Sequence, residues 1–240
     1  MQRILSQART AYRLHESLIG SGAVDASLMW TLPRLALAVQ VSMPPLDGAG
    51  IDYGDFVEGA AHAYGTLNEL VYRRQSDADL SLLSATCTPQ MRRVLASTAE
   101  ELHGSERAMT YTLEASDLAR RSLRAAVCDV FSSERERDLE HGLRGYDDVL
   151  HDVEDDDERT RLVQSMQEEL GSLRAARDDG DGEGRGDVVA AEFDVLFESN
   201  EKMSVEAAGQ TLRVEKRQLS TWRFLTLDLE NPEWRVAKIF

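Results

Sequence analysis

Cysteine and basic residues are both scarce in this sequence, and each shortage argues against a class of protein. Only Cys87 and Cys128 occur in 240 residues, too few for a disulfide scaffold or a cysteine-rich zinc site. Such usage favours a reducing compartment. Lys and Arg number 27 against 43 Asp and Glu, which gives a net charge of −16. Because affinity for nucleic acid comes from clustered Lys and Arg, this deficit argues against a general polyanion-binding protein.

The chain also lacks a long apolar run and the motifs of common enzymes. Its apolar stretch Leu35–Met43 is about half of the ~20 residues needed to cross a bilayer. GxSxG, GxGxxG, HExxH and GxxxxGK[ST] are absent. The segment from Asp179 to Gly184 has acidic residues at calcium-loop spacing, but Ala190 stands where the bidentate Glu belongs, which favours a charged turn. We therefore predict a non-enzymatic protein with no metal and no cofactor.

The N-terminal 45 residues, by contrast, contain few acidic residues. They hold Arg3, Arg9, Arg13 and Arg34 but only Glu16 and Asp25 as acidic residues. This pattern is typical of an organelle transit peptide, and an ordinary N-terminal helix is the alternative. Because a cluster of Pro and Gly occupies 44–50, we divide the chain into an N-terminal arm and linker (1–51) and a body (52–240).

The body begins with helical patterns and ends with strand patterns. Apolar residues recur at helical spacing over 56–71, a short helix is expected around Leu82, and Thr88-Pro89 is a typical helix start. Alternation over 109–113 indicates a strand, whereas 123–131 fits a strand or a helix. Helices first and strands last predict an α+β fold.

A charged helical insertion is expected at 132–186, between these two parts. One apolar stripe runs from Leu139 to Leu150 and a second from Leu162 to Leu173, which predicts a helical hairpin. The acidic run between the stripes supplies the residues that we predict to bind a basic partner surface: Asp147, Asp148, Asp152, Asp155, Asp156 and Asp157.

Large apolar residues dominate the C-terminal strand patterns, and they are our candidates for a pocket lining or a core. They are Phe193, Val195, Phe197, Trp222, Phe224 and Trp234. Aromatic stripes at strand spacing usually form core. A curved sheet closed by helices on one side can instead enclose an apolar pocket.

The chain resembles the Tim-forty-four-like domain family in two regions, about 52–131 and 187–240. The entry Phe56-Val57-Glu58-Gly59-Ala60 with Ala63-Tyr64 is similar to the start of that domain, and Trp222-Arg223-Phe224 with Asn231-Pro232-Glu233-Trp234 is similar to its end. The resemblance implies helices packed on a twisted, curved C-terminal antiparallel sheet, cone-like as in the nuclear-transport-factor-two-like fold. It also implies an apolar cavity and a non-catalytic role on the matrix side of the mitochondrial inner membrane.

From this resemblance we expect an accessory or scaffold subunit of a respiratory-chain or ATP-synthase assembly at the matrix face of the inner membrane. Its partners would be other subunits, with a lipid as a candidate occupant of the cone cavity. An acidic body is repelled by anionic lipids, so membrane contact would fall to the basic N-terminal arm.

Two alternatives remain. The first is a mitochondrial large-ribosomal-subunit protein that tethers the ribosome to the membrane. Nucleic-acid contact is disfavoured because basic groups are few: Arg73-Arg74, Arg92-Arg93, Arg120-Arg121 with Arg124, and Lys216-Arg217. The second is a small cone-fold enzyme or lipid-binding module, with Tyr111 and Asp194 as strand-borne candidates. Alternation places Asp194 on the face opposite Phe193, which argues against that reading.

Overall fold

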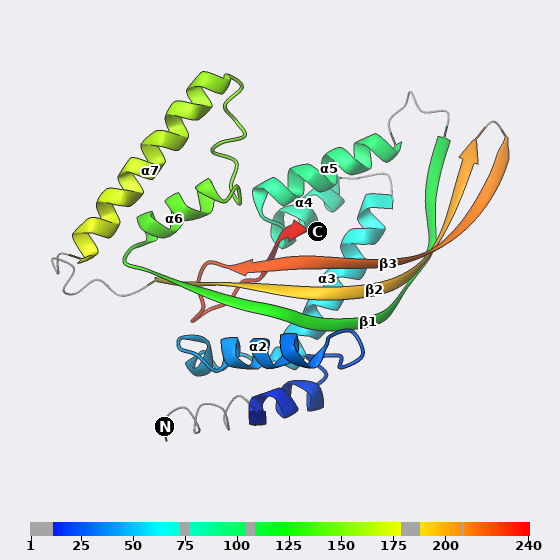
Figure 1. The fold of residues 1–240 in the computed structure, drawn as a ribbon. Helices are drawn as coiled ribbons and strands as arrows, with labels where there is room; N and C mark the ends of the chain where they lie inside the picture. Colours follow the sequence, from blue (N-terminus) through cyan, green and yellow to red (C-terminus); the bar gives the residue numbers. More distant parts are fainter. Residues whose placement is uncertain (1–11, 73–76, 104–108, 179–187, 208) are drawn as a thin grey trace.

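A computed structural model describes residues 12–72, 77–103, 109–178, 188–207 and 209–240. The fold is α+β, with helices before and within a four-stranded antiparallel sheet (Figure 1). Residues 12–20 are helical. They are followed by α2 (Thr31–Val41), the 3-10 turn η1 (Leu46–Gly48), α3 (Tyr53–Tyr72), α4 (Asp77–Thr86) and α5 (Pro89–His103). The predicted α+β class is therefore confirmed.

The sheet has the strand order β1-β2-β3-β4, so each strand pairs with its neighbour in sequence. Its members are β1 (Met109–Phe131), β2 (Val188–Ala207), β3 (Gln210–Thr226) and β4 (Arg235–Ile239). Residues 123–131, which fitted either structure, are the end of β1. Shifts of register after Leu113, Leu118 and Leu123 interrupt the alternation of β1, and β-bulges of this kind bend a strand.

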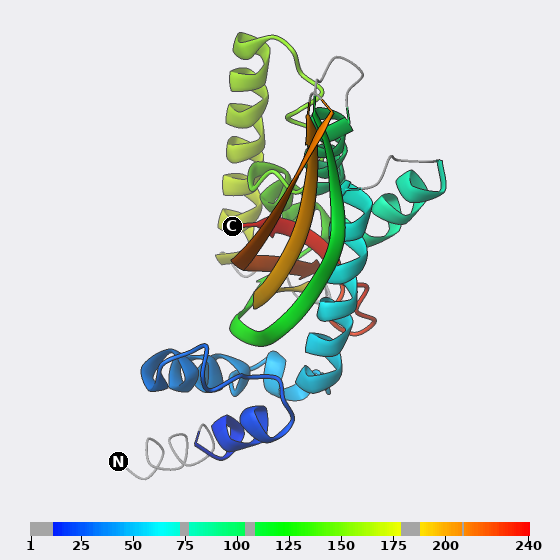
Figure 2. The same cartoon turned by 90° about the vertical axis from the view of Figure 1, so that its right-hand side faces the viewer.

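One core joins α3 to the inner face of the sheet. Phe56 and Tyr64 of α3 pack against Phe193 and Phe197 of β2. The ring centroids are 4.9 Å apart for Phe56–Phe193, which meet edge to face, and 4.6 Å apart for Tyr64–Phe197, which are tilted. Figure 2 shows α3 on one side of the curved sheet and α7 on the other. Burial on both faces explains why the first half of β2 is almost entirely buried and does not alternate.

The N-terminal helices cover the free edge of β1. The backbone N–H of Leu123 donates to the carbonyl oxygen of Ala23 at 2.8 Å, and that of Ala126 donates to Oε1 of Gln40 at 3.2 Å. Leu18 and Leu37 belong to the same core as Val57 and Phe193. An uncovered edge strand invites pairing with other chains, and here this segment occupies that edge.

The predicted arm thus contributes side chains to the core from residue 14 onward. The helix at 12–20 fits the reading of an ordinary N-terminal helix, whereas Arg3 and Arg9 lie outside the described residues. The Pro/Gly segment predicted as a linker contains η1, where Leu46 is buried. The boundary at residue 51 stays a prediction.

The other edge of the sheet is covered by the junction of α4 and α5. Thr88 donates its backbone N–H to the carbonyl oxygen of Val236 in β4 at 2.9 Å, and Cys87 forms a parallel bridge with the same residue. Helix α5 begins at Pro89, as the Thr88-Pro89 pair predicted.

The insertion between β1 and β2 contains α6 (Glu134–Leu143) and α7 (Asp156–Asp178). The two apolar stripes meet as predicted: Leu139, Met166 and Leu170 form a separate small core. The hairpin lies on the face of the sheet opposite α3 (Figure 2). There Tyr146 packs against Leu225 and Ala237, so the insertion is in contact with the body.

Candidate functional site: a cleft between the helical hairpin and the sheet

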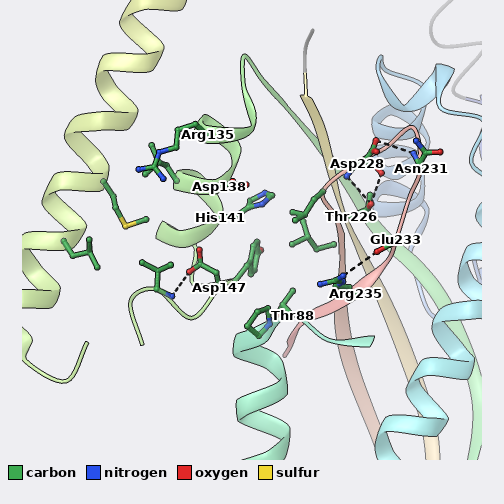
Figure 3. Close-up of a pocket in the computed structure, with 18 residues that line it drawn as sticks. Thr88, Arg135, Asp138, His141, Asp147, Thr226, Asp228, Asn231, Glu233 and Arg235 are labelled. Carbon is green, nitrogen blue, oxygen red and sulfur yellow. Dashed lines mark hydrogen bonds and ion pairs between the residues drawn. The ribbon is translucent and has the colours of Figure 1, made fainter. Parts of the chain in front are cut away.

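A partly open cleft of about 760 Å³ lies between the α6–α7 hairpin, the start of α5 and the β3–β4 connection (Figure 3). Leu139, Leu162 and Met166 line it from the hairpin, and Leu225 and Leu227 line it from β3 and the loop that follows. Its volume falls within the roughly 300–1,000 Å³ typical of small-molecule sites.

Local capping sets the direction of both helices of the hairpin. Ser133 is the N-cap of α6 and accepts the backbone N–H of Glu136 at 3.2 Å, while the Glu136 carboxylate accepts from the backbone and hydroxyl of Ser132 at 2.7 Å. This arrangement resembles a capping box. At the start of α7, Oδ1 of Asp155 accepts the N–H of Glu158 at 2.8 Å.

A network of charges fixes the hairpin to the sheet. Arg144, just after α6, donates from Nη1 to Asp129 and to Glu192, both at 2.7 Å. Arg223 of β3 holds Asp194 with two hydrogen bonds, at 2.7 and 3.0 Å, and also lies 2.9 Å from Glu192. Because Glu192 is buried and bonded to both arginines, it links the insertion to the sheet.

His141 of α6 is the least satisfied polar side chain of the cleft. It is 5% exposed, and neither ring nitrogen has a hydrogen-bond partner. Its ring is edge-on to Phe131 and Tyr146, with centroids 5.7 and 5.8 Å away. Burial, with the positive charges of Arg144 and Arg137, lowers the pKa of His141 to about 4, so the ring is neutral near pH 7. Figure 3 shows the imidazole extending from α6 toward the sheet.

The charged residues of the lining are engaged with one another or with the backbone. Arg135 holds Glu169 through two bonds of 2.7 Å, and Arg235 lies 3.5 Å from Glu233. Asp147 accepts the N–H of Val149 at 3.1 Å, and Asp228 accepts that of Glu230 at 2.9 Å.

The aromatic candidates lie on the other face of the sheet, and they occupy core positions. Phe193, Val195, Phe197, Trp222 and Phe224 are buried, and Trp234 is half-buried against the same core. These side chains therefore pack as core on the inner face, and the apolar cavity that the resemblance implied stays a prediction. The cleft described above lies on the opposite face, and the sequence patterns did not predict it, because it arises where two separate segments meet.

The acidic candidates are spread over several environments. Asp148 and Asp152 form ion pairs with Arg93 of α5, with Arg93 Nε 3.1 Å from Asp148. Asp156 pairs with Arg159 at 3.0 Å. Asp147 lines the cleft, Asp155 caps α7, and Asp157 is exposed in the first turn of α7. Part of the run is thus neutralised within the chain, and its role in partner binding stays a prediction.

Tyr111 and Asp194 are not brought together. Tyr111 lies opposite Val205 toward one end of β1, whereas Asp194 lies opposite Ala125 toward the other end. Asp194 is bonded to Arg223, on the face away from Phe193, as the alternation predicted.

A buried polar cluster lies around Tyr64, and the sequence analysis did not predict it. The Tyr64 hydroxyl is 2.7 Å from Oγ of Ser199 and 3.5 Å from Oε1 of Glu201. Nδ2 of Asn68, Oε2 of Glu201 and Oγ of Ser220 have no hydrogen-bond partner. Ser199 and Glu201 continue the period of two that begins at Phe193, so alternation extended by four residues would have placed both on the inner face.

The two free cysteines, Cys87 and Cys128, are not in surroundings that activate a thiol. Burial raises the pKa of Cys87 and of Cys128 to about 11, which disfavours the nucleophilic thiolate. In the described part of the chain, no cluster of three or more His, Cys, Asp or Glu could hold a metal ion. Among the helices with described residues, none is long and apolar enough to span a membrane. The Asp179–Gly184 segment lies outside the described residues.

Several basic groups considered for nucleic-acid contact are paired with acids. Arg120 and Arg217 both contact the buried carboxylate of Glu198, and Arg121 contacts Glu58. Arg92 lies 3.7 Å from Asp148. Arg73-Arg74 lies outside the described residues.

Comparison with known proteins returned no match among family models, curated proteins or solved structures.

Proposed function

We propose that this protein is a non-catalytic accessory subunit that docks on a larger protein assembly through an exposed apolar face of α2. The observation that carries the proposal is this face. Leu32 is 79% exposed, and Val39 and Met43 are also exposed; Trp30, which precedes the helix as its N-cap, is 86% exposed. Leu32, Ala36 and Val39 fall on one side of the helix at i, i+4 and i+7. Exposed apolar patches of this kind mark sites of interaction with proteins or membranes.

Charge supports a protein partner. Arg34 is the only charged residue of α2 in a chain with a net charge of −16. The arm that contains α2 was our candidate for membrane contact, but it packs directly on the acidic body, which an anionic membrane surface would repel and an apolar protein surface would not. The opposite side of α2, with Leu37, Ala38 and Val41, is already buried in the core, which anchors the helix to the body.

The resemblance to the Tim-forty-four-like domain adds the cellular setting to the proposal: an assembly such as a respiratory-chain or ATP-synthase complex, at the matrix face of the mitochondrial inner membrane. A ribosomal role has less support, because Arg92, Arg120, Arg121 and Arg217 are bonded to carboxylates and are therefore less available for RNA.

The test uses two matched double variants of the tagged full chain, expressed in mitochondria. Leu32→Glu with Val39→Glu introduces charge on the α2 face. Leu212→Glu with Leu219→Glu does the same at exposed apolar sites of β3, which are 64% and 62% exposed. After detergent solubilisation and sucrose sedimentation, we expect the wild type and the β3 variant to sediment with a membrane complex, and the α2 variant to remain near the top of the gradient.

Co-sedimentation of the α2 variant at the wild-type level would refute docking through this face. Sedimentation of the wild type with large ribosomal subunits would favour the ribosomal alternative instead.

A further inference from the structure

We propose that the cleft between the α6–α7 hairpin and the sheet binds an uncharged amphipathic small molecule whose polar group hydrogen-bonds to His141. This site is separate from the α2 face, so a test that refutes one of the two proposals does not refute the other.

The first argument is the unsatisfied imidazole. A neutral histidine carries one N–H donor and one acceptor nitrogen, and an unpaired buried polar group costs about 1–3 kcal/mol. His141 leaves both nitrogens without a partner at 5% exposure, on the side of α6 that borders the cleft. A ligand hydroxyl or amide can pair with either nitrogen, and a carbonyl with the N–H alone. Since both nitrogens are themselves buried, the wall of the cleft must shift slightly to admit the group.

The second argument is the apolar lining. Leu139, Leu162 and Met166 face Leu225 and Leu227 across the cleft. Methionine adapts its shape readily, which suits a wall that closes on a flexible chain. A volume of about 760 Å³ accommodates a ligand of small-molecule size.

The third argument is charge, which selects an uncharged polar group. The two arginines of the lining, Arg135 and Arg235, already contact Glu169 and Glu233. An anionic head group would therefore approach a rim that also carries Asp138, Asp147 and Asp228. A cationic head group would be attracted to that acidic rim, but beside His141 it would meet Arg144 and Arg137, whose positive charges outweigh the negative charges of Asp129 and Asp138 at the ring. A neutral head group avoids both costs.

The probe is 1-monolauroylglycerol, used below its micellar concentration, and sodium laurate is the matched anion with the same chain. The full chain is labelled with ¹⁵N in histidine, and the ring signals of His141 are assigned with His141→Gln. We expect saturable binding of one monolauroylglycerol per chain, a shift of the His141 ring nitrogens on binding, and at least tenfold weaker binding of laurate.

The matched variants are His141→Leu, which removes the hydrogen-bonding ring, and His62→Leu, which alters an exposed histidine of α3. We expect His141→Leu to weaken binding about tenfold, the value of one hydrogen bond, and His62→Leu to leave it unchanged. If His141→Leu perturbs the hairpin, the shift of the His141 ring signals in the wild type still shows whether the ligand contacts this side chain.

Failure of monolauroylglycerol to bind, binding without a change in the His141 signals, or equal binding of laurate would each overturn the proposal. If a protein segment occupied the cleft without monolauroylglycerol and excluded it, the proposal would also be overturned, and the cleft would be assigned to protein docking.

Discussion

Trp222 and Trp234 lie in the same aromatic core but differ in burial, so substitution of each should have a different cost. Trp222 is 2% exposed and packs 4.9 Å from Tyr64, whereas Trp234 is half-buried. We expect Trp222→Ala to lower the free energy of unfolding by about 3–5 kcal/mol and Trp234→Ala by about half as much. Urea denaturation of both variants measures this. Equal losses would mean that Trp234 is as well packed as Trp222.

His141 should make stability depend on pH in a defined direction. Its pKa is about 4 in the folded chain, below the 6.5 of an unperturbed histidine, so the unfolded state binds more protons between these values. The stabilisation is complete above pH 6.5 and is lost as pH falls toward 4, by about 3 kcal/mol in total. Glutamine at this position does not titrate. The free energy of unfolding of the wild type minus that of His141→Gln should therefore decrease as pH falls from 7.5 to 4.5, and parallel curves would contradict the shifted pKa.

At the residue scale, the sequence predicts on which face of a strand a side chain lies, but not which residues meet across the cleft. Alternation placed Asp194 and Phe193 on opposite faces of β2 correctly, because a strand has a fixed period. His141, in contrast, was one of five scattered histidines, and nothing in its neighbours along the chain indicates that Leu225 and Leu227 lie across from it. That proximity depends on tertiary packing between two segments far apart in sequence.

At the scale of single elements, Asp155 should act on α7 through its cap rather than its charge. Its carboxylate accepts the N–H of Glu158 at 2.8 Å. We expect Asp155→Ala to destabilise the first turn of α7 by about 1 kcal/mol and Asp155→Asn, which keeps the acceptor, by a few tenths at most. Hydrogen exchange of the α7 amides measures the difference. If Asp155 also contacts a basic partner, Asp155→Asn should weaken that binding without changing the exchange rates.

Helix α3 offers a matched pair of glycines that tests how the N-terminal segment packs on it. A Cβ at Gly54 would lie 2.9 Å from the backbone oxygen of Ser21, whereas one at Gly59 would meet no atom within 4 Å. We expect Gly54→Ala to lower the free energy of unfolding by about 1–3 kcal/mol through overpacking, and Gly59→Ala to raise it by about 0.5–1 kcal/mol. Both are read from urea denaturation. A neutral or stabilising Gly54→Ala would indicate that residues 12–51 move away from α3 readily.

Elements with strong local signals were predictable, and elements bent by tertiary contacts were less so. Thr88-Pro89 identified the start of α5 because both residues favour a helix N-terminus on their own. The end of β1 was ambiguous because three shifts in register disturb its period of two. Residues 31–41 were assigned to an arm because of the Pro and Gly cluster at 44–50. Their packing on the body was not evident, since α2 is apolar on two sides, with Leu37 buried and Leu32 exposed.

At the scale of the whole molecule, both chain connections of the insertion to the body lie at one end of the β1–β2 pair. Phe131, the last residue of β1, pairs directly with Val188, the first residue of β2. The chain thus leaves the sheet and returns to it at the same place. A two-residue Asn-Gly turn could close that gap, since such turns connect paired antiparallel strands.

Replacing residues 132–187 with Asn-Gly should leave the sheet intact but lower its stability. The hairpin covers Leu225 and Ala237, and Arg144 shares the buried carboxylate of Glu192 with Arg223. Exposing this apolar surface and removing one cation should lower the free energy of unfolding by about 3 kcal/mol or more. Circular dichroism checks that the sheet remains, and urea denaturation gives the loss. In the shortened chain, Glu192→Gln should recover part of the lost free energy of unfolding, because the carboxylate of Glu192 there has lost Arg144. An unchanged unfolding midpoint in the shortened chain would show instead that the hairpin contacts the sheet without stabilising it.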